Sequence, residues 1–414
     1  MFRFGVFIVI IFFTSKIVAT PDSKIDPQLL AGEDEDFNIP RENYQLNSTV
    51  PLVKCPAGTF RGSLEYTRGG RRYFSFQSIP YAEPPRRFEP TTLKAPLKDI
   101  YDATTQPPVC PQIPDDSPEY VGQEDCLYLS VSKPDESHCR EELSNGKLLP
   151  VMFWIHPGSY LNNNGSFFRG TYLLDECIVL VTFEYRVGAL GFLTTGDNVI
   201  PGNLGMKDQL IALRWTRRNI RYFLGDPNLV TIAGTSAGGT SVSHHICSPA
   251  SSGLFARAIS MSGAVLVPWA ITEKPLEIAK NLARKLNCLD LSSEGIKSCL
   301  LSKSARDIVN TQLSASEFTL RYTPVIEPKN APNPFQNAIP YHLLKTGQIN
   351  KVPYLIGFVQ DEGIFLAEPF LQRYAGAMDK FHENRETERE DDSNSSVGPD
   401  KSPGSTLQES FQFR

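Results

Sequence analysis

The sequence predicts an α/β protein with a largely parallel central sheet and helices on both of its faces. Continuous apolar runs of roughly four to eight residues, typical of strands buried on both sides, recur along the chain. Helical segments separate the later runs, the longest over residues 206–223, and such alternation is typical of a parallel sheet. The predicted core strands are residues 127–131, 149–155, 178–183, 230–233, 258–261 and 352–359.

Further elements are predicted on either side of this sheet. Residues 58–66 alternate weakly between apolar and polar side chains, Gly69-Gly70 can form a turn, and residues 73–77 return, which predicts a hairpin. Beyond the central strands, residues 274–286 and 304–313 predict two more helices.

The first 19 residues predict a cleaved signal peptide. Arg3 precedes a short apolar run over residues 6–13, and small residues at 19–20 come before a polar stretch. A membrane anchor is the alternative, but the run is shorter than the ~20 apolar residues that a span needs. No later window reaches that length, so we expect a secreted, extracellular protein without a membrane span.

Composition limits both the organisation and the function of the chain. Hydrophobic residues make up 41% and charged residues 21%, so a sizeable core can form. A net charge of −5 offers no basic field for nucleic acid. We expect one α/β domain over residues 51–378, preceded by a flexible acidic lead (20–50) and followed by a tail (379–414). Charge runs and Ser, Pro and Gly predict that this tail is disordered.

Eight cysteines are compatible with a secreted protein, because close pairs usually form disulfides in an oxidising compartment. Two pairs enclose short loops in polar surroundings: Cys110 with Cys126, and Cys288 with Cys299. The sequence alone cannot say how the other four cysteines pair, namely Cys55, Cys139, Cys177 and Cys247.

Other short motifs add little. No Cys-x-x-Cys or His-x-x-x-His spacing supports a zinc site, so no metal is expected. Sequons at Asn47, Asn164 and Asn394 predict glycosylation of a secreted chain, although so short a motif also arises by chance.

The most informative segment is Leu229–Gly239, which holds Gly234-x-Ser236-x-Gly238 directly after an apolar strand and before a predicted helix. This context is typical of a nucleophile elbow, a sharp turn that presents a serine hydroxyl. The N-terminus of the following helix favours negative charge. A glycine-rich turn without chemistry is the alternative, since the bare motif is common.

Neighbouring segments remove most of that ambiguity. The matching segments are Phe76-Gln-Ser-Ile-Pro-Tyr-Ala-Glu-Pro-Pro85, Gln123-Glu-Asp-Cys-Leu-Tyr-Leu129, Tyr185-Arg-Val-Gly-Ala-Leu-Gly-Phe192, Gly202-Asn-Leu-Gly-Met-Lys-Asp-Gln209, Gly225-Asp-Pro227 and Thr231-Ile-Ala-Gly-Thr-Ser-Ala-Gly238. In this order, over about residues 52–370, they resemble the type B carboxylesterase/cholinesterase family of α/β-hydrolases. Several resemble insect secreted carboxylesterases most closely.

The resemblance implies a serine esterase that acts on a small-molecule carboxylic ester without a cofactor. Ser236 matches the nucleophile, and Glu362, at the end of a predicted core strand, matches the acid that orients the catalytic imidazole. The alternative for Glu362 is an ordinary strand-end carboxylate.

The oxyanion hole that the resemblance implies is altered. Its N–H donors fall on Gly158, Ser159 and Ala237. The family usually reads His-Gly-Gly-Gly, whereas this chain reads His156-Pro-Gly-Ser159. If Ser159 must adopt a positive φ, its side chain costs about 1–2 kcal/mol.

Several other positions match the family. Cys110–Cys126 and Cys288–Cys299 fall on shared disulfides, and two charge pairs resemble internal ion pairs, Arg87 with Glu124 and Arg186 with Asp208. Trp269 falls where relatives line the acyl pocket, although plain core packing explains it equally well. No Trp lies between Cys110 and Cys126, where cholinesterases hold the choline ammonium, which argues against acetylcholine as the preferred substrate.

The catalytic histidine is the missing part. The family places it far downstream of the acid, but after Glu362 this chain carries only His382, in a context unlike the family motif. His244 and His245 follow Ser236 on one predicted helix, ~12 Å along its axis, and His156 is expected to be structural. Three hypotheses follow: a secreted serine carboxylesterase whose activity as this chain is doubtful, a non-catalytic esterase-fold binding protein, or an inactive truncated form.

Overall fold

A computed structural model describes residues 6–10, 50–312 and 322–363. Most of the predicted signal peptide and acidic lead, and the whole predicted tail with Asn394 and His382, lie outside the described residues, as does Asn47. The chain divides into two compact units, Met1–Phe358 and Val359–Arg414. The sheets and helices belong to the first unit, apart from the last residue of the final strand.

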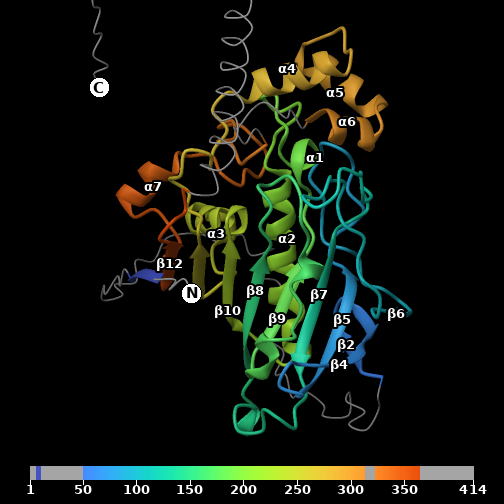
Figure 1. The fold of residues 1–414 in the computed structure, drawn as a ribbon, viewed down its shortest axis with the longest axis vertical. Coiled ribbons are helices and arrows are strands. Elements are labelled where there is room, and N and C mark those ends of the chain that lie inside the picture. The colour runs from blue at the N-terminus through green and yellow to red at the C-terminus, as the bar shows by residue number, and fades with distance from the viewer. Residues whose placement is uncertain (1–5, 11–49, 313–321, 364–414) are drawn as a thin grey trace, which may run out of the picture. The chain divides into compact units, whose positions relative to one another are not determined.

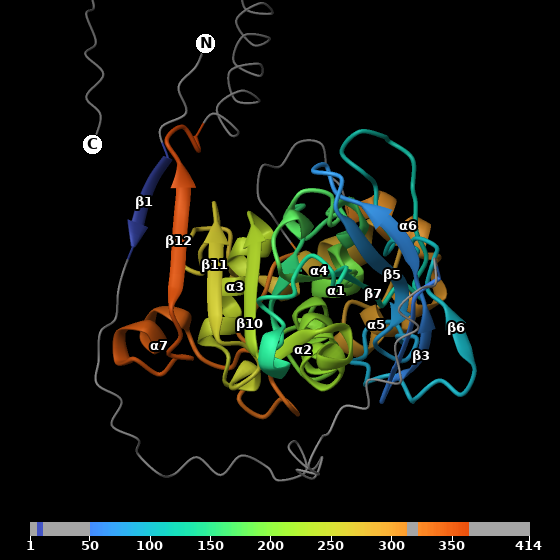
Figure 2. The ribbon, with the colours of Figure 1, turned by 90° about the horizontal axis from the view of Figure 1, so that it is seen from below.

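The described residues form a central sheet of nine strands (Figures 1 and 2). In spatial order these are β1 (Val6–Ile10), β12 (Tyr354–Val359), β11 (Arg257–Met261), β10 (Gly225–Thr235), β8 (Leu149–Ile155), β9 (Val179–Phe183), β7 (Tyr128–Pro134), β5 (Arg72–Pro80) and β4 (Ser63–Tyr66). The run from β12 to β9 is parallel, and β7, β5 and β4 add to it in antiparallel fashion. The α/β prediction is confirmed, with an antiparallel edge.

A smaller sheet stands beside the antiparallel edge. It is formed by β2 (Leu52–Cys55), β3 (Gly58–Arg61) and β6 (Ile100–Asp102). The predicted hairpin is therefore split, since residues 58–66 supply one strand to each sheet and only β4 pairs with β5.

Helices connect the strands and extend beyond their carboxyl ends. They are α1 (Gly188–Phe192), α2 (Leu204–Asn219), α3 (Ala237–Cys247), α4 (Pro275–Lys285), α5 (Ser293–Ser302), α6 (Ala305–Gln312) and α7 (Pro340–Thr346). The pieces α4, α5 and α6 lie together beyond the carboxyl ends of the parallel strands (Figure 1). Pro at the first position of α4 and the Ser292 hydroxyl, which accepts the Gly295 N–H at the start of α5, explain where these helices begin.

The core explains why the apolar runs become strands. All five residues of β9 are buried, as expected for a strand covered on both faces. The rings of Phe153 and Phe183 stack across β8 and β9 with centroids 4.5 Å apart. The helices α5 and α7 were not predicted from the sequence, because they are only 10 and 7 residues long and helical periodicity is weak over so few turns.

Both predicted disulfides are present, Cys110–Cys126 and Cys288–Cys299. A third bond joins Cys139 to Cys177, two of the cysteines that spacing could not pair. Within the described residues Cys55 and Cys247 remain free thiols. Three disulfides agree with folding in an oxidising compartment.

Candidate active site

Ser236 occupies a strained turn between β10 and α3. Its backbone has φ 54° and ψ −121°, a conformation that residues with a side chain rarely adopt. The Ser236 N–H donates to the carbonyl of Met261 at 2.8 Å, and its own carbonyl accepts the Thr240 N–H at 2.8 Å. Backbone bonds to β11 and α3 thus hold the strain, and the predicted strand-to-helix turn is present.

Glycines around Ser236 allow three backbone segments to approach one another. A Cβ on Gly238 would stand 2.1 Å from the carbonyl oxygen of Ile155, and one on Gly263 would stand 2.2 Å from that of Ser236. Since real Cβ atoms do not approach backbone oxygens so closely, only glycine fits at these positions. The turn therefore depends on its glycines for close packing.

Gly238→Ala should destabilise the protein by about 3 kcal/mol or more, because the clash is with rigid backbone of β8. Urea denaturation measures the loss. Gly357→Ala, in β12, is the matched control, since a Cβ there meets no atom within 4 Å. Its stability should change by less than about 1 kcal/mol. Equal effects of the two substitutions would contradict the close packing of the turn.

A second left-handed turn begins next to Ser236. Strand β8 pairs with β10 so that Ile155 lies opposite Gly234, which brings the segment after β8 alongside the serine turn. There Gly158 has φ 114° and Ser159 has φ 58°. Ser159 therefore adopts the positive φ whose cost was considered from the sequence, and the backbone at this residue is strained.

This turn folds back on itself and is anchored from behind. The carbonyl of Gly158 accepts the N–H groups of Leu161 and Asn162, and a Cβ on Gly158 would meet the Asn162 carbonyl at 2.2 Å. The carbonyl of buried Tyr160 accepts the Gly188 N–H at 2.6 Å, and its hydroxyl accepts the Ser241 hydroxyl of α3 at 3.2 Å. We call residues 158–160 the oxyanion turn, after the role that the sequence resemblance predicts for Gly158 and Ser159.

His156, directly before the oxyanion turn, is fully buried. Its ring stacks on Tyr185 with centroids 4.2 Å apart, and Nδ1 lies 2.8 Å from the Pro157 carbonyl. Burial lowers the pKa of His156 to about 4. These contacts agree with the structural role expected for it.

The two histidines of α3 are also engaged away from the serine. Nε2 of His244 lies 3.1 Å from the Ala270 carbonyl, while His245 contacts the Ser251 hydroxyl at 2.7 Å and the Gln209 side chain at 3.0 Å. Burial lowers the pKa of His244 to about 4 and that of His245 to about 3. Across the described part of the chain, none of the hydrogen bonds made by these rings reaches Ser236.

Two other predicted site residues stay predictions. Glu362 lies in the second unit, where it is exposed and its carboxylate accepts the Val359 N–H at 3.2 Å. Trp269 is half-buried and packs against the main core, which fits either role considered for it.

Both predicted ion pairs are present, and they brace the surroundings of the site. Arg186 contacts Asp208 through two nitrogens, each at 2.7 Å, in full burial. Arg87 pairs with Glu124 and also donates to the Leu300 carbonyl at the end of α5.

Two buried carboxyl groups escaped the sequence analysis. Glu327 pairs with Lys207 at 2.7 Å, and burial raises the pKa of Glu184 to about 8. Nothing in the local pattern around either residue signals its burial.

The described residues offer no convincing metal site. The one candidate group among them is Cys139, Glu142 and Cys177, but its two sulfurs form a disulfide and cannot act as thiolate ligands. In the same part of the chain, no helix has the length and apolar character needed to cross a bilayer.

The sequence is similar to those of known proteins over most of its length. The family model described as the carboxylesterase family matches residues 49–408. The chain is 38% identical to a carboxylic ester hydrolase of Bombus ignitus over 333 residues, or 78% of this chain and 59% of that protein. It is 39% identical to juvenile hormone esterase of Tribolium castaneum over 340 residues, 78% of this chain and 57% of the other.

The similarity also reaches a protein whose name does not denote an esterase. Neuroligin-2 of Mus musculus is 35% identical over 330 residues, 71% of this chain and 39% of that protein. Among solved structures, juvenile hormone esterase from Manduca sexta with OTFP covalently attached gives a TM-score of 0.66 at 29% identity. That match covers 73% of this chain and 59% of the other. The chain spans less than three-fifths of the length of each of these relatives.

Proposed function

Because the chain belongs to the carboxylesterase family, we propose that it is a serine carboxylic ester hydrolase that forms an acyl intermediate on Ser236. The observation that carries this proposal is the backbone of Ser236, held at φ 54° on a strand-to-helix turn beside the oxyanion turn. Strained backbone clusters at functional sites, and here it lies at the turn between β10 and α3 where a nucleophile is expected.

The proposed chemistry follows from the groups around Ser236. Its hydroxyl attacks the ester carbonyl, and the alcohol leaves as the tetrahedral intermediate collapses to the acyl-serine. The N–H groups of Gly158, Ser159 and Ala237 stabilise the oxyanion, helped by the N-terminus of α3. Glu362 orients the imidazole that removes the serine proton, a group that the family supplies further along the chain.

The substrate we propose is a small-molecule carboxylic ester. Relatives named carboxylic ester hydrolase and juvenile hormone esterase support this class. We further infer secretion, because the predicted signal peptide, the sequons and three disulfides all suit an extracellular protein.

A non-catalytic binding protein is the second candidate. The similarity to Neuroligin-2 favours it. The intact Ser236 and its strained turn favour the esterase.

The test of the proposed function uses this chain extended after residue 363 with the C-terminal segment of a carboxylesterase relative. In that protein, Ser236→Ala should lower kcat/KM for an aryl ester by at least ~10³-fold, because the nucleophile is lost. Ser262→Ala is the matched control, since Ser262 also has a positive φ of 51° and lies outside the proposed machinery. Turnover that survives Ser236→Ala would refute the assignment.

A further inference from the structure

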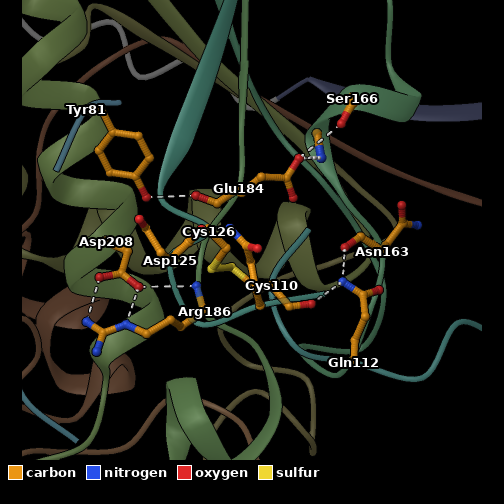
Figure 3. Close-up of a disulfide and its surroundings, with 12 residues drawn as sticks. Tyr81, Cys110, Gln112, Asp125, Cys126, Asn163, Ser166, Glu184, Arg186 and Asp208 are labelled. Carbon is orange, nitrogen blue, oxygen red and sulfur yellow. Dashed lines mark hydrogen bonds and ion pairs between the residues drawn. A yellow bond between two sulfur atoms is a disulfide. The ribbon is translucent and has the colours of Figure 1, made fainter. Parts of the chain in front are cut away.

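The loop that continues the oxyanion turn, residues 161–168, is held from two sides (Figure 3). On one side is the loop closed by the Cys110–Cys126 disulfide. Gln112 donates from Nε2 to the Asn163 carbonyl at 2.9 Å, and Asn162 donates from Nδ2 to Asp115 at 2.6 Å. These bonds fix the middle of the loop against a cross-linked segment.

On the other side the loop is held by Glu184, just beyond β9. One carboxyl oxygen, Oε1, accepts the Gly165 N–H at 3.0 Å and the Ser166 hydroxyl at 3.3 Å (Figure 3). The contact is close, because a Cβ on Gly165 would stand 2.6 Å from the backbone of Phe183. Gly165 and Glu184 are both buried, so the bond between them is shielded from water, whereas Ser166 is half-buried.

We propose that Glu184 is a positioning residue that fixes the loop carrying the oxyanion turn and releases that loop as the pH rises. The inference rests on the proposed function in one respect, namely that the oxyanion turn stabilises the oxyanion. The anchoring itself is a property of the fold, and it concerns a residue that touches neither Ser236 nor the oxyanion turn directly.

Charge explains the direction of the effect. Burial raises the pKa of Glu184 to about 8 in the closed loop, whereas an open, hydrated carboxyl would titrate near its ordinary value of about 4.5. Opening therefore releases a proton between these two values. Across that range the open fraction should rise about tenfold per pH unit, and above pH 8 it should level off.

Other charged and titratable groups also lie around Glu184. Residues 163–168 carry no charged side chain. Arg186 and Asp208 form an ion pair with each other, and Asp125 is exposed. The imidazole of His156, whose pKa burial lowers to about 4, is neutral in this range. The neighbouring phenols are Tyr81, whose hydroxyl donates to the Glu184 carbonyl, and Tyr185. Burial raises the pKa of both well above the ordinary value, so neither ionises in this range.

Hydrogen exchange of the 414-residue protein tests the proposal without requiring activity. After correction for the intrinsic exchange rate, opening of the 158–168 peptide should rise about tenfold per pH unit between pH 5 and 8 and stay flat above. Glu184→Gln, which keeps an acceptor oxygen but cannot ionise, should hold the loop closed at every pH. Glu184→Leu removes both the acceptor oxygen and the ionisable group, so the loop should open to the same extent at every pH.

The remote helix α4 serves as the internal reference for global unfolding. Global unfolding also hydrates Glu184, so the two regions are compared by their opening rather than by slope alone. Opening of the 158–168 peptide that exceeds that of α4, with a slope removed by Glu184→Gln, supports the proposal. The same slope in Glu184→Gln, or opening of the peptide no greater than that of α4, overturns it. If the loop behaves as proposed but the extended protein hydrolyses no ester, the proposed function fails while the anchoring stands.

Discussion

Lowering the pH from 7 to 4 should unfold this protein, because three buried imidazoles are kept neutral in the folded state. Burial lowers the pKa values of His156 and His244 to about 4 and that of His245 to about 3. In the unfolded chain each would bind a proton near pH 6.5. Below that pH the unfolded state binds more protons, so the free energy of unfolding falls as the pH falls.

The size of the effect follows from the same pKa values. At pH 4 each of the three imidazoles costs about 3 kcal/mol, or about 9 kcal/mol together. Glu184 acts in the opposite direction, since its raised pKa stabilises the fold as the pH drops, and it offsets about 3 kcal/mol. The remaining loss of about 6 kcal/mol is comparable with the whole stability of many domains.

Urea denaturation at a series of pH values measures this loss. His156→Phe keeps a ring to stack on Tyr185 and removes one titrating group, so it should lessen the acid destabilisation by about half, from about 6 to about 3 kcal/mol. His342→Gln is the matched control, because it also removes a histidine but at an exposed position on α7. An unchanged pH dependence in His156→Phe would show that its burial is not what makes the fold acid-sensitive.

Much of the site could be predicted because it depends on local sequence. Ser236 sits between an apolar strand and a helix, and Gly234 and Gly238 mark the tight turn in the sequence itself. The same holds for Ser159, whose position in a turn shaped for glycine raised the concern about a positive φ that the structure bears out.

What could not be predicted depends on segments that are distant in sequence. Cys139 and Cys177 are 38 residues apart, and only the folded sheet brings them together. In the sequence Glu184 resembles an ordinary strand-end residue. Its burial depends on contact with Gly165, which lies 19 residues away in the chain. Burial of a polar side chain is a property of the whole fold, and no local pattern announces it.

The second large effect concerns catalysis. Expressed as 414 residues, the protein should hydrolyse an aryl ester at least ~10³-fold more slowly than the extended protein described above. A serine hydroxyl is a poor nucleophile without a base, and His156, His244 and His245 are all engaged elsewhere. Binding and the oxyanion donors leave only residual catalysis. Steady-state rates of the two proteins, measured side by side, give the ratio.

The serine variant separates a slow enzyme from one with an unexpected base. In the 414-residue protein Ser236→Ala should barely change the residual rate, because the missing base already limits it. Full, Ser236-dependent turnover by the short protein would mean that a base is at hand. His382 is the remaining histidine after Glu362, so His382→Ala would then identify it, and our expectation that His382 takes no part would be wrong.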